Sequence, residues 1–505
     1  MLARAAFIGI AVGTLAVGVL GCRRAGDDTL EIRVGVRADV TGIFPNPPIV
    51  SEGFTFVTNM HIFDGLTGLD GSQRVIPALA DGWETPSDTR YVFQLRRGLR
   101  FSDGRALRAQ DVAASLNAAI TRRWVNRDWL QAIESVRALD DRRVEIKTSL
   151  PDLALPYELP RGFVLPAQVL DQAPVPPVGS GQYTLESRQP GREFVLARNP
   201  YYRGPPPAVS RARFLVVPDA DERLERLLRG ELDVVDGLAI ERVAQLENDP
   251  RVRVYHGSGN RLLLLCMRVA GGPLSDPRLR QAIDRAIDRD ELVDRVYGGR
   301  AEVAPQVIHP HVVGYDPERR PEKSDRALAR ALLARAGFPN GFEIRLDGPN
   351  NRYAGDVELL DEVRRQLGLV GIRVTVAAAD KVEFFALVDS GGSNFHLLGW
   401  AFDTGEAGDA LAQLFHTPRT GLLGTANAMG LADPELDALI DRARGSRGAE
   451  ERAGLLRNAA RRAAEHRSVI PLVIQPEALA TSRRLVWQPP RSYGLWLAHF
   501  LPAPE

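Results

Sequence analysis

The chain has 505 residues, which is too long for a single hydrophobic core, so two or three folded units are expected. It carries 64 basic and 64 acidic side chains, with 44% hydrophobic and 25% charged residues. This composition is ordinary for a globular protein and leaves no net charge to attract polyanions, so we predict no nucleic-acid partner.

The first 22 residues have the layout of a secretion signal. Arg4 precedes an uncharged stretch over 5–21, and small residues then lead to Cys22. The last four residues of the segment resemble the bacterial lipobox, in which the cysteine is acylated and becomes the new N-terminus. We therefore predict a lipoprotein signal peptide over 1–22, lipidation of Cys22 and a polar tether over 23–29. The alternative is an uncleaved anchor helix, because the apolar stretch is close to the shortest that can cross a bilayer.

Strand and helix patterns alternate along the rest of the chain. Polar–apolar alternation and apolar runs predict strands over 31–36, 91–95, 143–146, 342–346, 372–377, 395–399 and 469–474. Capping residues and helical spacing predict helices that begin near Pro277 and Ser324, and helices over 289–297, 356–367, 434–444 and 450–466. The proline-rich stretches 174–177 and 205–207 predict loops. Strands that alternate with helices predict an α/β fold class.

Catalytic motifs are missing from the sequence. It contains no Gly-x-Ser-x-Gly elbow, no glycine-rich phosphate loop that ends in Gly-Lys and no His-Glu-x-x-His pair. His309 and His311 form the one close histidine pair, whereas a metal site needs three or four converging ligands. Cys266 lies in an apolar run and is predicted to be a buried small side chain. We predict no enzyme activity, no cofactor and no metal.

Short segments with a distinctive order run through the chain. They are 62–66, 75–84, 91–112, 178–183, 199–202, 230–233, 276–282, 332–337 and 367–372. The most specific is 91–112, where a strand, a basic turn and Phe101-Ser102-Asp103-Gly104 lead into a helix that opens with Ala109-x-Asp111. Phe101 and Trp83 are predicted core anchors because large aromatic side chains bury much area. Together these segments resemble the family 5 extracellular solute-binding proteins, which include dipeptide- and oligopeptide-binding proteins.

The resemblance implies a two-lobed periplasmic-binding-protein-like clamp whose lobes are joined by hinge strands. Lobe 1 would span 30–260 with an extra subdomain at about 50–170, lobe 2 would span 261–472, and 473–505 would return to lobe 1. Such a clamp encloses its ligand by hinge closure.

The resemblance also implies a function. The chain would be a monomeric, lipid-anchored binding component on the extracytoplasmic face of the membrane, which binds a small solute, most simply a short peptide, and delivers it to an ABC permease in the inner membrane. Alternatives are a non-peptide ligand such as a nickel chelate, haem, an opine or an oligosaccharide, and a peptide-sensing lipoprotein. A secreted hydrolase on a similar scaffold is a further alternative.

One segment is predicted to contact the ligand. Residues 399–406 resemble the family segment whose aspartate pairs with the α-ammonium group of a bound peptide, and Asp403 occupies that position. An ordinary turn is the alternative for Asp403, because Thr404-Gly405 follows it. Trp400 is assigned to the floor of a side-chain pocket, with core packing as its alternative, and Phe402 is assigned to the binding site with it.

Two arginines complete the predicted site. Arg352 is assigned to a ligand carboxylate, which a guanidinium binds with two parallel hydrogen bonds, and a surface position is the alternative. Arg268 departs from the family pattern and is expected near the ligand.

Overall fold

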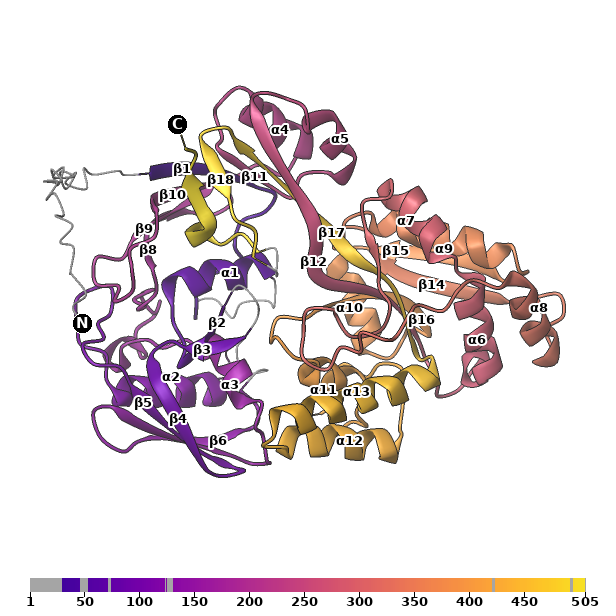
Figure 1. Ribbon diagram of the computed structural model, residues 1–505, viewed down its shortest axis with the longest axis horizontal. Helices are drawn as coiled ribbons and strands as arrows, with labels where there is room; N and C mark the ends of the chain where they lie inside the picture. Colours follow the sequence, from indigo (N-terminus) through magenta and orange to yellow (C-terminus); the bar gives the residue numbers. More distant parts are fainter. Residues whose placement is uncertain are drawn as a thin grey trace, which may run out of the picture.

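A computed structural model describes residues 30–45, 53–70, 74–122, 124, 130–419, 423–490 and 494–504. Figure 1 shows an elongated molecule with two bodies, joined at its top by the long strands β12 (Val252–Met267) and β17 (Val469–Ser482). The predicted signal peptide, the tether and Cys22 lie outside the described residues.

One eleven-stranded sheet of the described residues runs through both bodies. Its path is β15-β14-β16-β12-β17-β11-β1-β10-β9-β8, and β13 also pairs with β17. The strands on the lobe 1 side are β1 (Leu30–Val36), β8 (Tyr183–Gln189), β9 (Glu193–Arg198), β10 (Val209–Val216) and β11 (Val234–Asp236). Those on the lobe 2 side are β13 (Glu302–Val303), β14 (Glu343–Pro349), β15 (Arg373–Ala379) and β16 (Phe395–Ala401). The α/β class predicted from the sequence is confirmed.

The two long strands change register in the middle. They pair without interruption from Val252 to Ser258, and pairing resumes at Leu262 opposite Ile474. A bulge of this kind bends a strand locally and leaves backbone groups outside the ladder. The predicted boundary between residues 260 and 261 falls within this break.

Lobe 1 also contains a smaller four-stranded sheet. Its order is β4 (Ala80–Ser87), β5 (Arg90–Leu95), β7 (Arg143–Thr148) and β6 (Ile133–Ala138). Around it lie α1 (Gly53–Ile62), the hairpin of β2 (Thr67–Leu69) and β3 (Val75–Pro77), α2 (Ala109–Thr121) and α3 (Leu155–Glu158). These elements fall within the predicted subdomain at about 50–170. Phe101 is fully buried in the lobe 1 core as predicted, whereas Trp83 is only partly buried against it.

The C-terminal segment completes the lobe 1 core. After β17 the chain forms β18 (Leu485–Trp487) and β19 (Phe500–Pro502), which pair with each other. Leu485, Trp487 and Phe500 are buried in the same cluster as the side chains of β1 and α2. A core shared by both ends of the described chain ties the last strands to lobe 1.

Helices cover both faces of the lobe 2 part of the sheet. They are α6 (Pro277–Ala286), α7 (Arg289–Tyr297), α8 (Arg326–Arg335), α9 (Asp356–Gly368), α10 (Lys381–Asp389), α11 (Gly408–Leu414), α12 (Pro434–Gly445) and α13 (Ala449–His466), while α4 (Ala220–Leu228) and α5 (Val243–Leu246) pack near β11 and β12. Alternation along β12 places Leu262 and Cys266 in one core cluster and Leu263 and Met267 in another. The sheet therefore separates two cores in lobe 2.

Gly179 is required by a close approach of two backbones. A Cβ atom at this position would lie 2.0 Å from the carbonyl oxygen of Ile62, at the end of α1. We expect Gly179→Ala to lower the free energy of unfolding by about 1–3 kcal/mol, the usual cost of overpacking, as measured by urea denaturation. The control is Gly82→Ala, where no atom lies within 4 Å of the added carbon. Equal stabilities of the two variants would contradict the prediction.

Candidate functional site

Asp403 lies where the two lobes meet. It follows β16 in lobe 2, and its side chain is 41% exposed. Arg161 reaches it from lobe 1: Nη2 donates to the Asp403 carbonyl oxygen at 2.8 Å and lies 3.8 Å from Oδ2. The Arg161 side chain is only 5% exposed. Asp403 is thus a half-exposed carboxylate beside a buried cation of the opposite lobe.

The hinge holds Asp403 from a second side. Asn260, in the register break of β12, donates a side-chain hydrogen bond to Oδ1 of Asp403, and its carbonyl oxygen accepts from the Phe402 backbone at 2.9 Å. His309 Nε2 is 2.9 Å from the carbonyl oxygen of Gly259, the neighbouring hinge residue. The orientation of the Asp403 carboxylate therefore depends on the conformation of the hinge.

Further carboxyl groups surround this point. Burial raises the pKa of Asp409 to about 6, although Arg161 opposes the shift. Burial, with Asp152 next, also raises the pKa of Glu158 well above its usual value. Glu158 belongs to lobe 1 and Asp409 to lobe 2, so acidic groups face each other across the gap between the lobes. The surroundings of Asp403 favour a cationic group over an additional anion.

Glu477 is an acidic residue of the hinge strand β17. A Cβ atom at Gly259 would lie 2.6 Å from its Oε1, so the side chain lies over the register break. Burial, with smaller contributions from Asp236 and Asp403, raises its pKa to about 8 against the opposing effects of Arg261 and Arg37. Its carboxyl group is therefore protonated in the folded protein at neutral pH, whereas it ionises at its ordinary pKa in the unfolded chain.

We expect Glu477 to make stability fall as pH rises. Between the unfolded pKa of 4.5 and the folded pKa of about 8, the folded state binds one proton more than the unfolded state. Relative to Glu477→Gln, the wild-type chain should lose at least about 1 kcal/mol of unfolding free energy between pH 5 and pH 8. Urea denaturation of both proteins at each pH measures this difference, and parallel pH profiles would contradict it.

The other predicted residues of 399–406 are mainly packed in the interior. Phe402 is 2% exposed and lies 6.0 Å from the His309 ring, between ring centroids. Trp400 is partly buried against the same core cluster, and its Nε1 has no hydrogen-bond partner within the described residues. Both side chains support the loop that carries Asp403.

The two predicted arginines lie apart from each other. Arg352 is in the loop between β14 and α9, where its backbone N–H donates to Asp356, and the neighbouring Tyr353 hydroxyl accepts from the Gly399 backbone at 2.8 Å. Arg268 follows the other end of β12 and donates to the Gly391 carbonyl oxygen at 2.6 Å. Strand geometry separates it from the hinge by roughly 20 Å. The structure does not bring Arg268 to Asp403.

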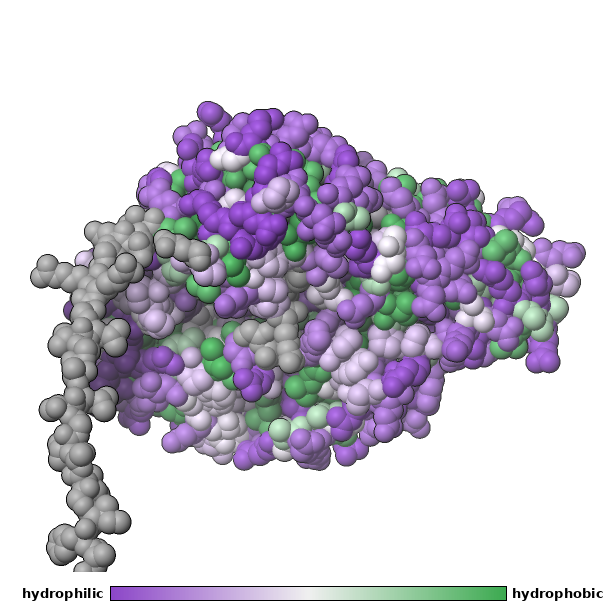
Figure 2. Space-filling model, turned by 45° about the horizontal axis from the view of Figure 1, so that its top comes forward, coloured by the Kyte–Doolittle hydropathy of each residue, from purple (hydrophilic) through white to green (hydrophobic). Residues whose placement is uncertain are grey.

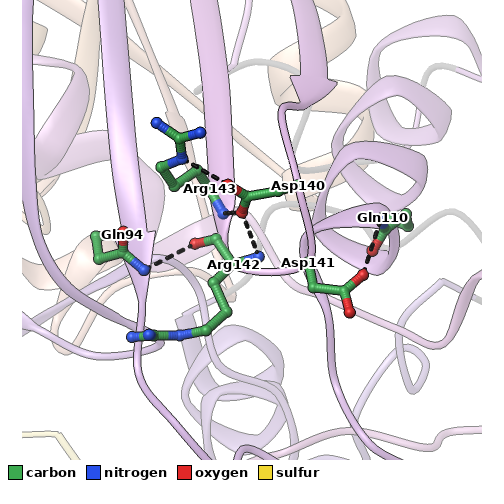
Figure 3. A pocket seen from close by; sticks show the side chains of 6 residues that line it. All are labelled: Gln94, Gln110, Asp140, Asp141, Arg142 and Arg143. Carbon is green, nitrogen blue, oxygen red and sulfur yellow. Dashed lines mark hydrogen bonds and ion pairs between the residues drawn. The ribbon is translucent and has the colours of Figure 1, made fainter.

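A surface depression on lobe 1 is a separate feature. It has a volume of about 560 Å³ and is lined by Gln94, Gln110, Asp140, Asp141, Arg142 and Arg143 (Figure 3). Its side chains bond to each other or to nearby backbone: Arg143 Nε donates to Asp140 at 2.6 Å, and Gln110 is 3.4 Å from Asp141. It lies at the turn between β6 and β7 and includes no residue that contacts Asp403.

The potential metal ligands of the described residues do not assemble into a site. No cluster of three or more potential ligands is present there, and both ring nitrogens of His309 are occupied, since Nδ1 accepts from the His311 backbone at 3.3 Å. None of the helices in the described ranges combines the length and the apolar character needed to cross a membrane. The face in Figure 2 is mostly hydrophilic, with apolar residues in small separate groups.

Comparison with known proteins identifies the family. The sequence model of "Bacterial extracellular solute-binding proteins, family 5 Middle" matches residues 74–421, more than half of the chain. The glutathione-binding protein GsiB of Shigella dysenteriae is 26% identical over 507 residues, which cover 97% of this chain and 95% of that protein. Heme-binding protein A of Haemophilus influenzae is 24% identical over 456 residues, 82% of each protein.

The fold has close structural counterparts as well. The ABC transporter-associated periplasmic binding protein DppA from Helicobacter pylori, solved in complex with peptide STSA, superposes with a TM-score of 0.81 at 21% identity. The match covers 94% of this chain and 98% of that chain, and confirms the two-lobed fold predicted from the sequence. These relatives are named as binding proteins and not as enzymes. The chain belongs to family 5 of the bacterial extracellular solute-binding proteins, the extracytoplasmic binding components of ABC importers.

Proposed function

We propose that the protein binds a short peptide between its lobes and anchors the peptide's α-ammonium group on Asp403. The observation that carries this proposal is the half-exposed Asp403 carboxylate at the junction of hinge, lobe 1 and lobe 2. Glutathione and the peptide STSA, bound by two of the similar proteins, are both peptidic.

The contacts of Asp403 leave it able to bind an ammonium group. Asn260 holds Oδ1, whereas Oδ2 is 3.8 Å from the Arg161 guanidinium, beyond hydrogen-bond distance. A ligand ammonium could approach Oδ2 to about 2.8 Å and form a charge-assisted hydrogen bond, which is roughly twice as strong as a neutral one. The peptide backbone would pair as an added strand, which gives affinity without selecting side chains.

The remaining parts of the proposal concern place and partners. The protein is a monomer without catalytic activity, held at the outer face of the cell membrane by lipid on Cys22, and it passes its ligand to an ABC permease. In this proposal the segment 1–22 is removed as a signal peptide, lobe 1 spans 30–260 with its return at 473–505, and lobe 2 spans 261–472.

A non-peptide ligand is the second candidate. Heme-binding protein A covers most of this chain at an identity similar to that of GsiB, so the ligand class is not fixed by overall similarity. The buried cation Arg161 beside Asp403 would suit a ligand that carries an acidic group, such as a haem propionate, a chelate or an opine.

Native mass spectrometry distinguishes the two candidates. The full chain would be purified gently from membranes in mild detergent and analysed before and after denaturation. We expect heterogeneous adducts that denaturation releases as short peptides. A single non-peptide adduct would replace the peptide proposal by the second candidate, and conversion of a released ligand by the purified protein would contradict the absence of catalysis.

A further inference from the structure

The lobes meet a second time, away from the hinge strands. In Figure 1 the end of α12 lies next to the four-stranded sheet, on the side of the molecule opposite to β12 and β17. We call this contact the tip junction. It consists of Asp88, Pro151, Asp152 and Leu153 of lobe 1 and Arg444, Gly445 and Arg447 of lobe 2.

Arg444 is the centre of the tip junction. Its Nη2 is 2.9 Å from Oδ2 of Asp152, and its carbonyl oxygen accepts from the Leu153 backbone at 2.8 Å. The side chains of Arg444 and Asp152 are 13% and 0% exposed. Both charges would be hydrated if the lobes were apart, so closure removes them from water as a pair.

The buried pair is incompletely satisfied. Oδ1 of Asp152 and Nε of Arg444 are buried and have no hydrogen-bond partner among the described residues. In such a pair the cost of removing two charges from water is close to the attraction gained, so the net contribution is small. Removal of Arg444 is different, because the buried Asp152 carboxyl group then loses its ion-pair partner and keeps only Arg452 as a nearby cation. The intact ion pair therefore changes the free energy of lobe closure only slightly, whereas loss of one of its charges makes closure strongly unfavourable.

A second ion pair lies at the edge of the junction. Arg447 Nε donates to Asp88 Oδ1 at 2.7 Å, and the two side chains are 58% and 48% exposed. Exposed pairs of this kind contribute little to stability. This pair therefore helps to align the two lobes but contributes little to the free energy of their contact. The stability of the contact depends mainly on Arg444 and Asp152.

We propose that the tip junction is a latch that holds the two lobes together and sets the fraction of ligand-free molecules that are closed. Since a ligand must enter between the lobes, the latch also sets how much of the protein is open to accept it. The proposal goes beyond the choice of ligand, because every group in the latch belongs to the protein.

The structure offers a direct probe of closure. A Cβ atom on Gly445 would lie 3.6 Å from the Cβ atom of Pro151, within the range of a disulfide bond. Pro151→Cys with Gly445→Cys should therefore form a bond across the lobes only when the tip junction is closed. The remaining described cysteine, Cys266, is buried in the lobe 2 core.

The test measures the rate of this cross-link in the full chain. Bound ligand is stripped by unfolding in guanidinium and refolding, and cross-linking is followed by intact mass after thiol alkylation. We expect the ligand-free protein to cross-link, and Arg444→Met to slow the reaction at least about tenfold. Arg442→Met is the matched control, since Arg442 is an exposed residue of the same helix that forms no ion pair within the described residues, and it should leave the rate unchanged.

Two outcomes would overturn the latch: no cross-link in the ligand-free protein, or an equal rate with and without Arg444. If Arg444→Met fails to refold, as judged by near-ultraviolet circular dichroism, the exposed Arg447→Met replaces it and should slow the reaction about twofold. An unchanged rate in that variant would then reject the proposal. No ligand is present in any arm, so the result is independent of whether Asp403 binds a peptide.

Discussion

Arg452→Met is expected to lower the free energy of unfolding by about 3–5 kcal/mol, the usual cost of leaving one charge of a buried pair uncompensated. Arg452 of α13 donates to both carboxylate oxygens of Glu406, at 2.8 and 2.5 Å, and to the Ala443 carbonyl oxygen at 2.5 Å. The two side chains are 8% and 2% exposed. In the variant Glu406 would remain buried with no ion-pair partner among the described residues.

Urea denaturation, followed by tryptophan fluorescence, measures this loss. Arg457→Met is the matched control, because Arg457 lies one and a half turns further along α13 and makes no ion pair within the described residues. It should change stability by less than about 0.5 kcal/mol. A loss below about 1 kcal/mol for Arg452→Met would show that the interior around Glu406 is more hydrated than the structure implies.

Asp403→Ala is expected to weaken the binding of a short peptide at least about tenfold, because it removes a charge-assisted hydrogen bond to the α-ammonium group. The melting temperature of the ligand-free protein should stay nearly unchanged. Arg161 keeps its bond to the main-chain carbonyl oxygen of residue 403, which the substitution does not remove. Isothermal titration with a peptide recovered from the native protein measures the affinity.

Two variants make the Asp403 result specific. Asp403→Asn keeps the shape of the side chain but removes its negative charge. It should lose most of the affinity for the peptide, because the charge strengthens the hydrogen bond to the ammonium group. Asp389→Ala, at the exposed C-terminal end of α10, is the control and should bind as the wild type does. Unaltered affinity of Asp403→Ala would remove Asp403 from the binding site.

The elements with clear local signals were predictable from the sequence. Asp288 caps α7 by accepting from the Glu291 backbone, and Gly298 ends that helix in the left-handed conformation. Asp433 likewise caps α12. In these places the side chain and the backbone group that it contacts are only a few residues apart. A short stretch of sequence is therefore enough to predict the contact.

Elements that depend on distant partners were not predicted. The pattern of 469–474 indicated a short strand, whereas β17 continues to Ser482 because β11 and β12 supply its partners. Helix α10 was missed because it buries only Phe384 and Val388 and so lacks a clear apolar stripe. Local propensity is a weak guide where tertiary contacts decide the conformation.

The candidate site shows the same division. The family-like segment 399–406 drew attention to Asp403, but Arg161 and Asn260 lie 242 and 143 residues away in sequence. No motif surrounds either residue. The contact between the lobes brings Arg161 to the carboxylate, and the pairing of β12 with β16 brings Asn260 to it. Arg268 was assigned to the site because the sequence departs from the family pattern there. Such a departure does not show that the residue lies at the end of β12 far from the hinge.

The return of the C-terminal segment to lobe 1 has a consequence for biosynthesis. Trp487 and Phe500 are buried among side chains from β1 and α2, which leave the ribosome several hundred residues earlier. Lobe 1 therefore cannot complete its core while the chain is still being made. The stable fold of lobe 1 therefore waits until the last strands have been made, and its core stays open to solvent until then.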